Sequence, residues 1–318
     1  MAASILTITP NPSLDISGVV QQLVPNEKSY VYEEKRQPGG NGVNAGVMAK
    51  NLGAKVLVSG FLGGETGVEF LELLKKMKLP QNFVFVRNRT RSNVTVSQDK
   101  THQQTRLSFA GPNISRSEVK LLFKKVQTLA FSQIMIGGSL PSGFSTNDLT
   151  HLIKLGRQFD VPVFVDVPGH ILKQVVKAKP FFIKPNLTEF QELVGKNVTG
   201  REEVIREALK LTRFIDVICV SSVDGGALLV TKNDVFFGKI KKIKVRSTVG
   251  AGDSMVGAML YYINKHGGKQ SPGTIDWEQM LRWGLAASAG TLTNIGLGIG
   301  KKQDVIKHLS KIKTERII

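Results

Sequence analysis

The stretch STVGAGDSMVGAM, residues 247–259, places three small residues directly in front of a carboxylate. Gly250, Ala251 and Gly252 precede Asp253, and an apolar run follows, which predicts a helix over residues 250–266. An acid in the first turn of a helix is favoured because free N–H groups and the helix dipole are positive there. Glycines at the same place can also leave N–H groups open to a phosphate, with the acid ready to accept a proton. The stretch alone allows both interpretations.

Outward from this stretch, short runs of Val, Ile and Phe alternate with amphipathic helical patterns. The expected strands are 4–9, 54–63, 133–138, 161–167, 180–186, 216–221, 227–231 and 235–240, and the expected helices are 43–53, 66–79, 146–159, 170–178, 201–212 and 276–293. Continuous apolar strands that alternate with helices are typical of a parallel sheet covered on both faces. We therefore predict a single α/β domain over residues 1–318, with a doubly wound, mainly parallel sheet.

Two polar, β-like stretches interrupt this alternation, at residues 16–37 and 87–111. Within the second, NVTVSQD and QTRLSFA can pair as a hairpin. We expect the two insertions to form one small β-sheet, which could act as a lid that excludes water from an active site. A purely structural flap or a dimer surface is the alternative.

The bulk composition limits the classes of protein. A chain of 318 residues with 41% hydrophobic residues can bury a large core, and no 18-residue apolar run suggests a membrane span. The only cysteine, Cys219, lies in an apolar strand-like run, so we expect a buried thiol and a cytoplasmic location. The net charge of +18 raises nucleic acid as a partner, but the basic residues are scattered and suit small anionic substrates equally well.

Several polar motifs follow predicted strands, where ligands bind in open α/β sheets. Asp15 in NPSLD could accept hydrogen bonds from sugar hydroxyls, or could merely cap a turn. Asn186 and Glu189 in KPNLTE could face one Mg²⁺, although NLTE also fits a capping box. In RNRTRSN, residues 87–93, an arginine could clamp a phosphate.

The order of three motifs is more specific than any one of them. PGGNGVN early, KPNLTE in the middle and STVGAGDSMVG late strongly resemble the signature regions of the PfkB (ribokinase-like) carbohydrate kinases. TPNPSLD, TRSNV and GGSLPSG resemble its phosphofructokinase branch, most of all the minor bacterial 6-phosphofructokinase and tagatose-6-phosphate kinase. The resemblance implies a ribokinase-like fold with a β lid and transfer of the γ-phosphoryl group of ATP to a sugar hydroxyl.

The resemblance also implies roles for individual residues. Asp253 is the expected general base, and Gly250, Ala251 and Gly252 form the expected anion hole. The expected substrate-binding residues are Asp15, Gly39, Gly40, Asn44, Arg91 and Ser139, with Lys28 and Arg106 on the lid. The expected nucleotide-binding residues are Lys184, Asn186, Ser221, Gly226, Ser247 and Asn294, with Asn186 and Glu189 acting on Mg²⁺. Carbonyls around Val249, Asn294 and Gly296 are candidates for a monovalent cation such as K⁺, and a homodimer through the lid is expected.

One departure bears on the substrate. Relatives that act on tagatose 6-phosphate or fructose 1-phosphate typically read GGKG where this chain reads GGNG, with Asn41 in place of the lysine. This difference favours fructose 6-phosphate, converted to the 1,6-bisphosphate, with tagatose-6-phosphate kinase or 1-phosphofructokinase as alternatives. A non-catalytic sugar-phosphate or nucleotide-binding protein is a further alternative, because a fold alone does not establish an activity.

Overall fold

The computed structural model describes residues 5–101, 103–241, 243–267, 275–294 and 298–318. Its main sheet has the strand order β14-β13-β12-β11-β10-β9-β8-β1-β4-β5. The strands are β1 (Ile5–Thr9), β4 (Val56–Gly63), β5 (Val84–Val86), β8 (Gln133–Gly137), β9 (Val163–Asp166), β10 (Phe182–Ile183), β11 (Val217–Val223), β12 (Gly226–Val230), β13 (Val235–Ile240) and β14 (Ile312–Arg316). Neighbours from β5 to β11 are parallel, and β12, β13 and β14 continue the sheet antiparallel.

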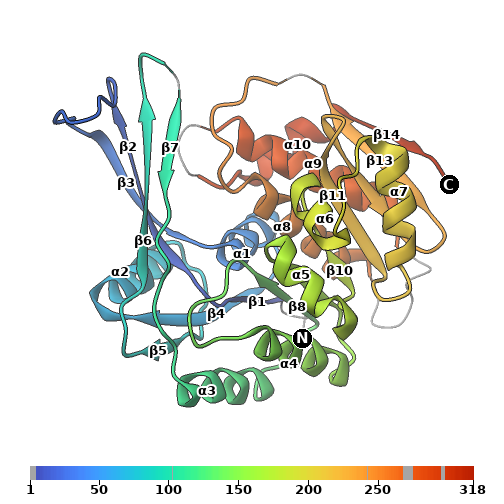
Figure 1. Cartoon of the computed structure of the whole chain (residues 1–318), viewed down its shortest axis with the longest axis horizontal. Coiled ribbons are helices and arrows are strands. Elements are labelled where there is room, and N and C mark those ends of the chain that lie inside the picture. The colour runs from blue at the N-terminus through green and yellow to red at the C-terminus, as the bar shows by residue number, and fades with distance from the viewer. Residues whose placement is uncertain (1–4, 102, 242, 268–274, 295–297) are drawn as a thin grey trace.

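Helices cover both faces of this sheet (Figure 1). One face carries α1 (Asn41–Leu52), α2 (Gly64–Lys76), α8 (Ala251–His266), α9 (Trp277–Leu292) and α10 (Lys302–Leu309). The other carries α3 (Arg116–Gln127), α4 (Thr146–Gln158), α5 (Gly169–Val175), α6 (Leu187–Val194) and α7 (Gly200–Leu211), with a short 3₁₀ turn at Val176–Ala178. Each face buries its own hydrophobic cluster, as a doubly wound sheet requires. The predicted fold class is confirmed.

Local sequence accounts for several helix boundaries. Helices α3 and α4 begin after Ser115 and Ser145, whose hydroxyls accept hydrogen bonds from the N–H groups of Glu118 and Asp148 in capping boxes. Helix α1 ends at Gly53 in the left-handed conformation, as its sequence predicts. Among the elements that the sequence analysis did not predict are α3, α10 and the short strands β5 and β14.

A second sheet has the order β3-β2-β6-β7 and projects from one side of the molecule (Figure 1). It consists of β2 (Ser13–Val20), β3 (Tyr32–Gly39), β6 (Arg91–Gln98) and β7 (Gln104–Leu107), which we call the small sheet. The predicted hairpin is present, since β6 and β7 pair antiparallel. Strands β2 and β3 begin three residues before the first predicted insertion, 16–37, and end two residues after it, so Asp15 lies within a strand rather than in a turn.

Strand β1 marks the point where the chain order of the main sheet reverses, because β4 lies on one side of it and β8 on the other. Crevices beyond the carboxyl ends of strands at such a point are the usual ligand sites of doubly wound sheets. The segments after β1, β8, β9, β10 and β11 all leave the sheet at this edge. No helix within the described part of the chain is long and apolar enough to cross a membrane.

Candidate active site

The turn in front of α8 has the geometry of an anion-binding loop. Gly250 is the N-terminal cap residue, with φ of 76° in the left-handed region, and its carbonyl accepts a 2.8 Å hydrogen bond from the N–H of Ser254. A Cβ at this position would lie 2.7 Å from Cδ1 of Ile299, so a glycine is needed both for the turn and for its packing. The N–H groups that open the helix belong to Ala251, Gly252 and Asp253.

Asp253 lies in the first turn of α8 and is held by helix α1. Nδ2 of Asn44 donates a 2.7 Å hydrogen bond to Oδ2 of Asp253. Burial, together with the negative charge of Asp166, raises the pKa of Asp253 to about 7, against the opposing effects of Asn44, Lys184 and Arg106. A carboxyl group with a pKa near neutrality suits a general base, because it is largely ionised yet basic enough to take a proton.

A buried lysine and a second acid lie beside this turn. Nζ of Lys184 is 3.4 Å from Oδ1 of Asp166, and a Cβ on Gly252 would lie 3.3 Å from the same Nζ. Although burial opposes the charge, the acids Asp166, Glu189 and Asp253 raise the pKa of Lys184, so the ammonium form is retained next to the anion hole. A cation and free N–H groups therefore face the same small volume.

Asp166 is a site residue that the sequence analysis missed. It ends strand β9, is 5% exposed, and its Oδ2 accepts a 3.3 Å hydrogen bond from Nδ2 of Asn41. The signal was available, because VFVDV places an acid at the carboxyl end of a strand that is otherwise apolar. Asn41, noted for its place in the glycine motif, therefore lies among the acids of the site.

Asp15 is fixed at the root of the small sheet. Its Oδ1 accepts hydrogen bonds from Oγ of Ser13 at 2.6 Å and from Nδ2 of Asn93 at 3.1 Å. Its Oδ2 lies against Gly39, where a Cβ would come within 2.2 Å, and is 3.9 Å from Nη2 of Arg106. Because Gly39 has no side chain, the carboxylate of Asp15 fits against it. Oδ2 accepts neither of the two hydrogen bonds from Ser13 and Asn93 and faces Arg106.

Arg91 connects the small sheet to the main domain. Its Nη1 donates to the carbonyl of Phe109 at 2.9 Å and its Nη2 to the carbonyl of Asn11 at 2.8 Å. The buried Nε has no hydrogen-bond partner among the described residues, and burial lowers the pKa of the guanidinium. Asn11 donates in turn to Oγ of Ser139 at 3.0 Å, which brings the predicted Ser139 into the same group. Asn11 was not predicted as a site residue.

A cavity of about 600 Å³ extends along the opposite side of the α8 turn. Six predicted residues line it: Lys184, Asn186, Ser221, Gly226, Ala251 and Gly252. Met255, Leu285 and Leu292 supply an apolar part. A lining with both polar and apolar side chains suits a nucleotide, whose phosphates and base have these contrasting needs, and we call this space the nucleotide-shaped cavity.

Asn186 and Glu189 form the capping box that the sequence allowed. The side chain of each accepts a 2.9 Å hydrogen bond from the backbone N–H of the other. Burial and the charge of Asp166 raise the pKa of Glu189, so a cation beside these two acids would relieve unfavourable charge. Within the described ranges no three His, Cys, Asp or Glu side chains form a closed metal cage. The donor set fits Mg²⁺, which keeps waters and phosphate oxygens in its shell.

Other predicted residues lie apart from this group. Lys28 is exposed in the loop between β2 and β3, at the end of the small sheet away from Asp15. Ser247 is buried and lines a separate cavity between the small sheet and residues 244–248. Nδ2 of Asn294 donates to the carbonyl of Gly298 at 3.4 Å, and Asn294 does not line the nucleotide-shaped cavity. Gly296 lies outside the described residues. Cys219 is buried as predicted, and burial raises the pKa of its thiol to about 12.

The doubly wound sheet, the glycine turn and the adjacent acid place an anion-binding site beside a candidate general base, which are the parts that a phosphotransferase needs. Residues 11–304 match the profile of the pfkB family carbohydrate kinases, and the chain belongs to that family.

Similar proteins cover the whole chain. The 1-phosphofructokinase of Bacillus subtilis (strain 168) is 30% identical over 318 residues, covering 98% of this chain and all of the relative. Phosphofructokinase-2 of Escherichia coli in complex with potassium superimposes with a TM-score of 0.90 at 28% identity, covering 97% of this chain and 98% of the other. The same enzyme in complex with fructose-6-phosphate gives a TM-score of 0.88 at 27% identity and the same coverage.

Proposed function

We propose that the protein transfers the γ-phosphoryl group of ATP to O1 of fructose 6-phosphate, giving fructose 1,6-bisphosphate. The observation that carries this proposal is the position of Asp253, with a pKa of about 7, at the helix start that also holds the anion-binding turn. Gly252 lines the nucleotide-shaped cavity, and Arg106, whose charge acts on Asp253, lies 3.9 Å from Asp15. Asp253 therefore lies between the two halves of the site.

In the proposed reaction, Asp253 accepts the proton of the sugar hydroxyl as that oxygen attacks phosphorus. The N–H groups of the α8 start and the ammonium of Lys184 stabilise the charge on the transferring group. Phosphoryl transfer depends mainly on such positioning and charge stabilisation, since little covalent chemistry is asked of the protein. Asn186, Glu189 and Asp166 would hold Mg²⁺, which neutralises phosphate charge when bound.

The small sheet would bind the sugar. The free side of Asp15 would accept hydrogen bonds from hydroxyl groups, and Arg91, with Arg106, would bind the phosphate already on the substrate. Gly39, Gly40, Asn44 and Ser139 would line the same pocket. Lys28 lies too far along the small sheet to join this pocket within one chain, so a role for Lys28 requires a second copy.

Fructose 6-phosphate and fructose 1-phosphate present the same elements, a phosphorylated arm and a free hydroxymethyl arm on opposite sides of a ring. An arginine anchor and a base at the far end can accept either. Asn41 beside Asp166 favours fructose 6-phosphate, because the lysine typical of 1-phosphofructokinases is missing. The 30% identity to a 1-phosphofructokinase supports fructose 1-phosphate as the second candidate. Tagatose 6-phosphate is the third candidate, and it rests on the resemblance of the sequence motifs alone.

An ADP-release assay with ATP, Mg²⁺ and each of the three sugar phosphates tests the proposal. The highest kcat/KM with fructose 6-phosphate is the expected result. A preference for fructose 1-phosphate or tagatose 6-phosphate would overturn the substrate while keeping the mechanism. Absence of turnover with all three, in a protein that still binds ATP, would overturn the proposed reaction.

We also propose a homodimer through the small sheet and a K⁺ site at carbonyls of Val249 and Asn294. The small sheet and the segments next to it expose Tyr30, Val31, Leu107 and Phe109, each more than half exposed. Exposed apolar patches of this kind mark interaction surfaces. For the dimer, sedimentation of Val31→Glu should show a monomer where the unmodified chain is a dimer. For the cation site, activity should be higher in K⁺ than in Na⁺ at equal ionic strength.

A further inference from the structure

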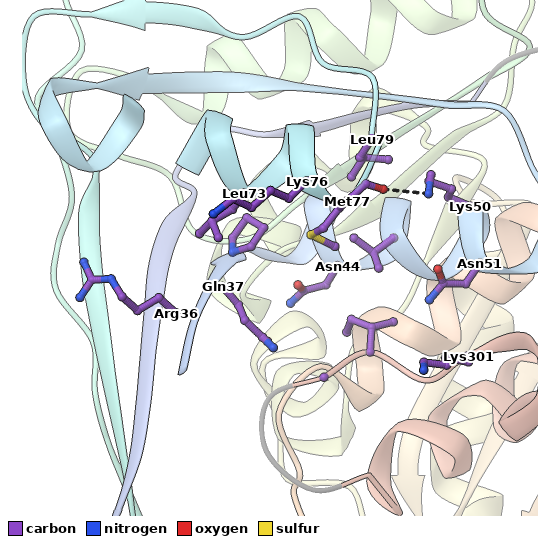
Figure 2. Close-up of a pocket in the computed structure, with 14 residues that line it drawn as sticks. Arg36, Gln37, Asn44, Lys50, Asn51, Leu73, Lys76, Met77, Leu79 and Lys301 are labelled. Carbon is purple, nitrogen blue, oxygen red and sulfur yellow. Dashed lines mark hydrogen bonds between the residues drawn. The ribbon is translucent and has the colours of Figure 1, made fainter. Parts of the chain in front are cut away.

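A cavity of about 450 Å³ lies beside the proposed sugar pocket and shares Asn44 with it (Figure 2). It lies where the end of β3, helix α1, the last turn of α2 and residues 298–301 meet, and it is partly open to solvent. None of its lining residues is shared with the nucleotide-shaped cavity. Figure 2 shows Gln37, Asn44, Asn51 and Lys301 around this space, with Leu73 and Met77 of the α2 end beside it. We call it the hinge cavity, because the small sheet joins the main domain here.

The hinge cavity is basic, and none of the described residues that line it is acidic. Its cations are Arg36, Lys50, Lys76 and Lys301. Arg36 is paired with Glu69 at 2.6 Å and with Glu34 at 3.3 Å, so its charge is already compensated.

The three lysines of the cavity differ in their partners. Nζ of Lys50 donates to the carbonyl of Met77 at 3.0 Å, and this bond leaves its charge uncompensated. In the part of the chain that the structure describes, neither Lys76 nor Lys301 forms a salt bridge through its ammonium group. Lys76 interacts electrostatically with Glu69, so the uncompensated positive charge belongs to Lys50 and Lys301. The cavity combines this charge with the apolar surface of Leu73 and Met77.

The hinge cavity touches the proposed catalytic residues through two elements. Asn44 lines it and donates the hydrogen bond that holds Asp253. Gln37 and Pro38 line it and directly precede Gly39, which packs against the carboxylate of Asp15. A molecule in the cavity would contact both segments at once.

We propose that the hinge cavity binds a small organic phosphate with an apolar part, and that its occupancy changes catalysis through Asn44 and the end of β3. Lysine ammonium groups attract a phosphate group, and the apolar wall favours a carbon skeleton over inorganic phosphate. The binding part of this proposal is independent of which sugar is phosphorylated.

Calorimetric titration with phenyl phosphate tests the binding, with phenol and inorganic phosphate as separate probes of the apolar and anionic parts. We expect phenyl phosphate to bind more tightly than either. Lys301→Ala should weaken its binding about tenfold or more, the usual effect of losing a hydrogen bond to a charged group. Lys302→Ala, the matched control, removes an exposed lysine that does not line the cavity.

Gly298→Phe locates the site. An added Cβ at Gly298 meets no atom within 4 Å, so this lining position has room to begin a side chain beside the hinge cavity. This variant should lose phenyl phosphate binding while it still binds ATP. Absence of binding to the unmodified protein, or equal binding to Gly298→Phe, would overturn the site.

The coupling is tested by the effect of phenyl phosphate on kcat/KM, measured within each variant. The unmodified enzyme should show at least a twofold change that Gly298→Phe lacks. An effect of the same size in both proteins would place phenyl phosphate at the catalytic pocket and refute the coupling. Failure of the kinase assay itself would count against the proposed reaction and would leave the binding result standing.

Discussion

The pH dependence of kcat/KM reports directly on Asp253. With a pKa of about 7, the carboxyl group is about 9% ionised at pH 6 and about 91% ionised at pH 8. If the ionised form takes the proton, kcat/KM should rise about tenfold between these two values, because only that form is active. An aspartate at its ordinary pKa would leave only the smaller rise, about twofold, that titration of the substrate phosphate near pH 6 can cause.

Asn44→Ala makes the test specific to this carboxylate. The hydrogen bond from Asn44 stabilises the ionised carboxylate of Asp253, so removing the Asn44 side chain should raise the pKa of Asp253. A hydrogen bond to a charged group is worth about 1.5–3 kcal/mol, which moves the midpoint up by about 1–2 pH units. Asn51→Ala is the matched control, because Asn51 lies on the same helix and donates to the carbonyl of Gly300 instead.

Initial rates measured in one mixed buffer at fixed ionic strength would give kcat/KM against pH for the unmodified enzyme, Asn44→Ala and Asn51→Ala. The phosphate of the substrate also titrates, near pH 6, but it does so equally for every variant. The difference in midpoint between Asn44→Ala and Asn51→Ala is therefore the informative quantity. Equal midpoints, or only the smaller rise of about twofold in the unmodified enzyme, would refute the role given to Asp253.

Three further substitutions test the remaining parts of the site. Asp253→Asn should lower kcat about 10²–10⁴-fold with unchanged ATP affinity by calorimetry, and near-normal turnover would remove it as the base. Arg91→Ala should raise KM for the sugar phosphate about tenfold or more; a lowered Tm with unchanged KM would instead assign Arg91 to holding Phe109 and Asn11. Gly250→Ala should cost at least about 1–2 kcal/mol of unfolding free energy in urea titrations, because its φ of 76° disfavours a side chain.

The sequence predicted the main sheet well, because buried parallel strands such as residues 133–138 and 161–167 are continuous apolar runs. It missed β5 and β14, which are short edge strands, since edge pairing leaves little trace in composition. The motif glycines and Asp253 could be found because the order of the three motifs resembles the signature regions of a known family, whereas the stretch alone fitted an ordinary helix start equally well. Asp166 was overlooked although VFVDV places an acid at a strand end, but its contact with Lys184 could not be predicted from the sequence. Asn11 was missed because its importance comes from a long-range contact, with Ser139.

The pairing of β2 with β6 has a consequence for how the protein folds. Asp15 on β2 and Asn93 on β6 are 78 residues apart in the sequence. The chain between them forms strand β3 of the small sheet and the elements α1, β4, α2 and β5 of the main domain. Pairs so distant in sequence carry a large loop-closure cost and form late unless the intervening segment is already folded. The small sheet therefore depends on prior docking of β4 onto β1. Substitutions that destabilise the buried side chains of β4 should then disrupt the pairing of β2 with β6 around Asp15 before the main domain unfolds.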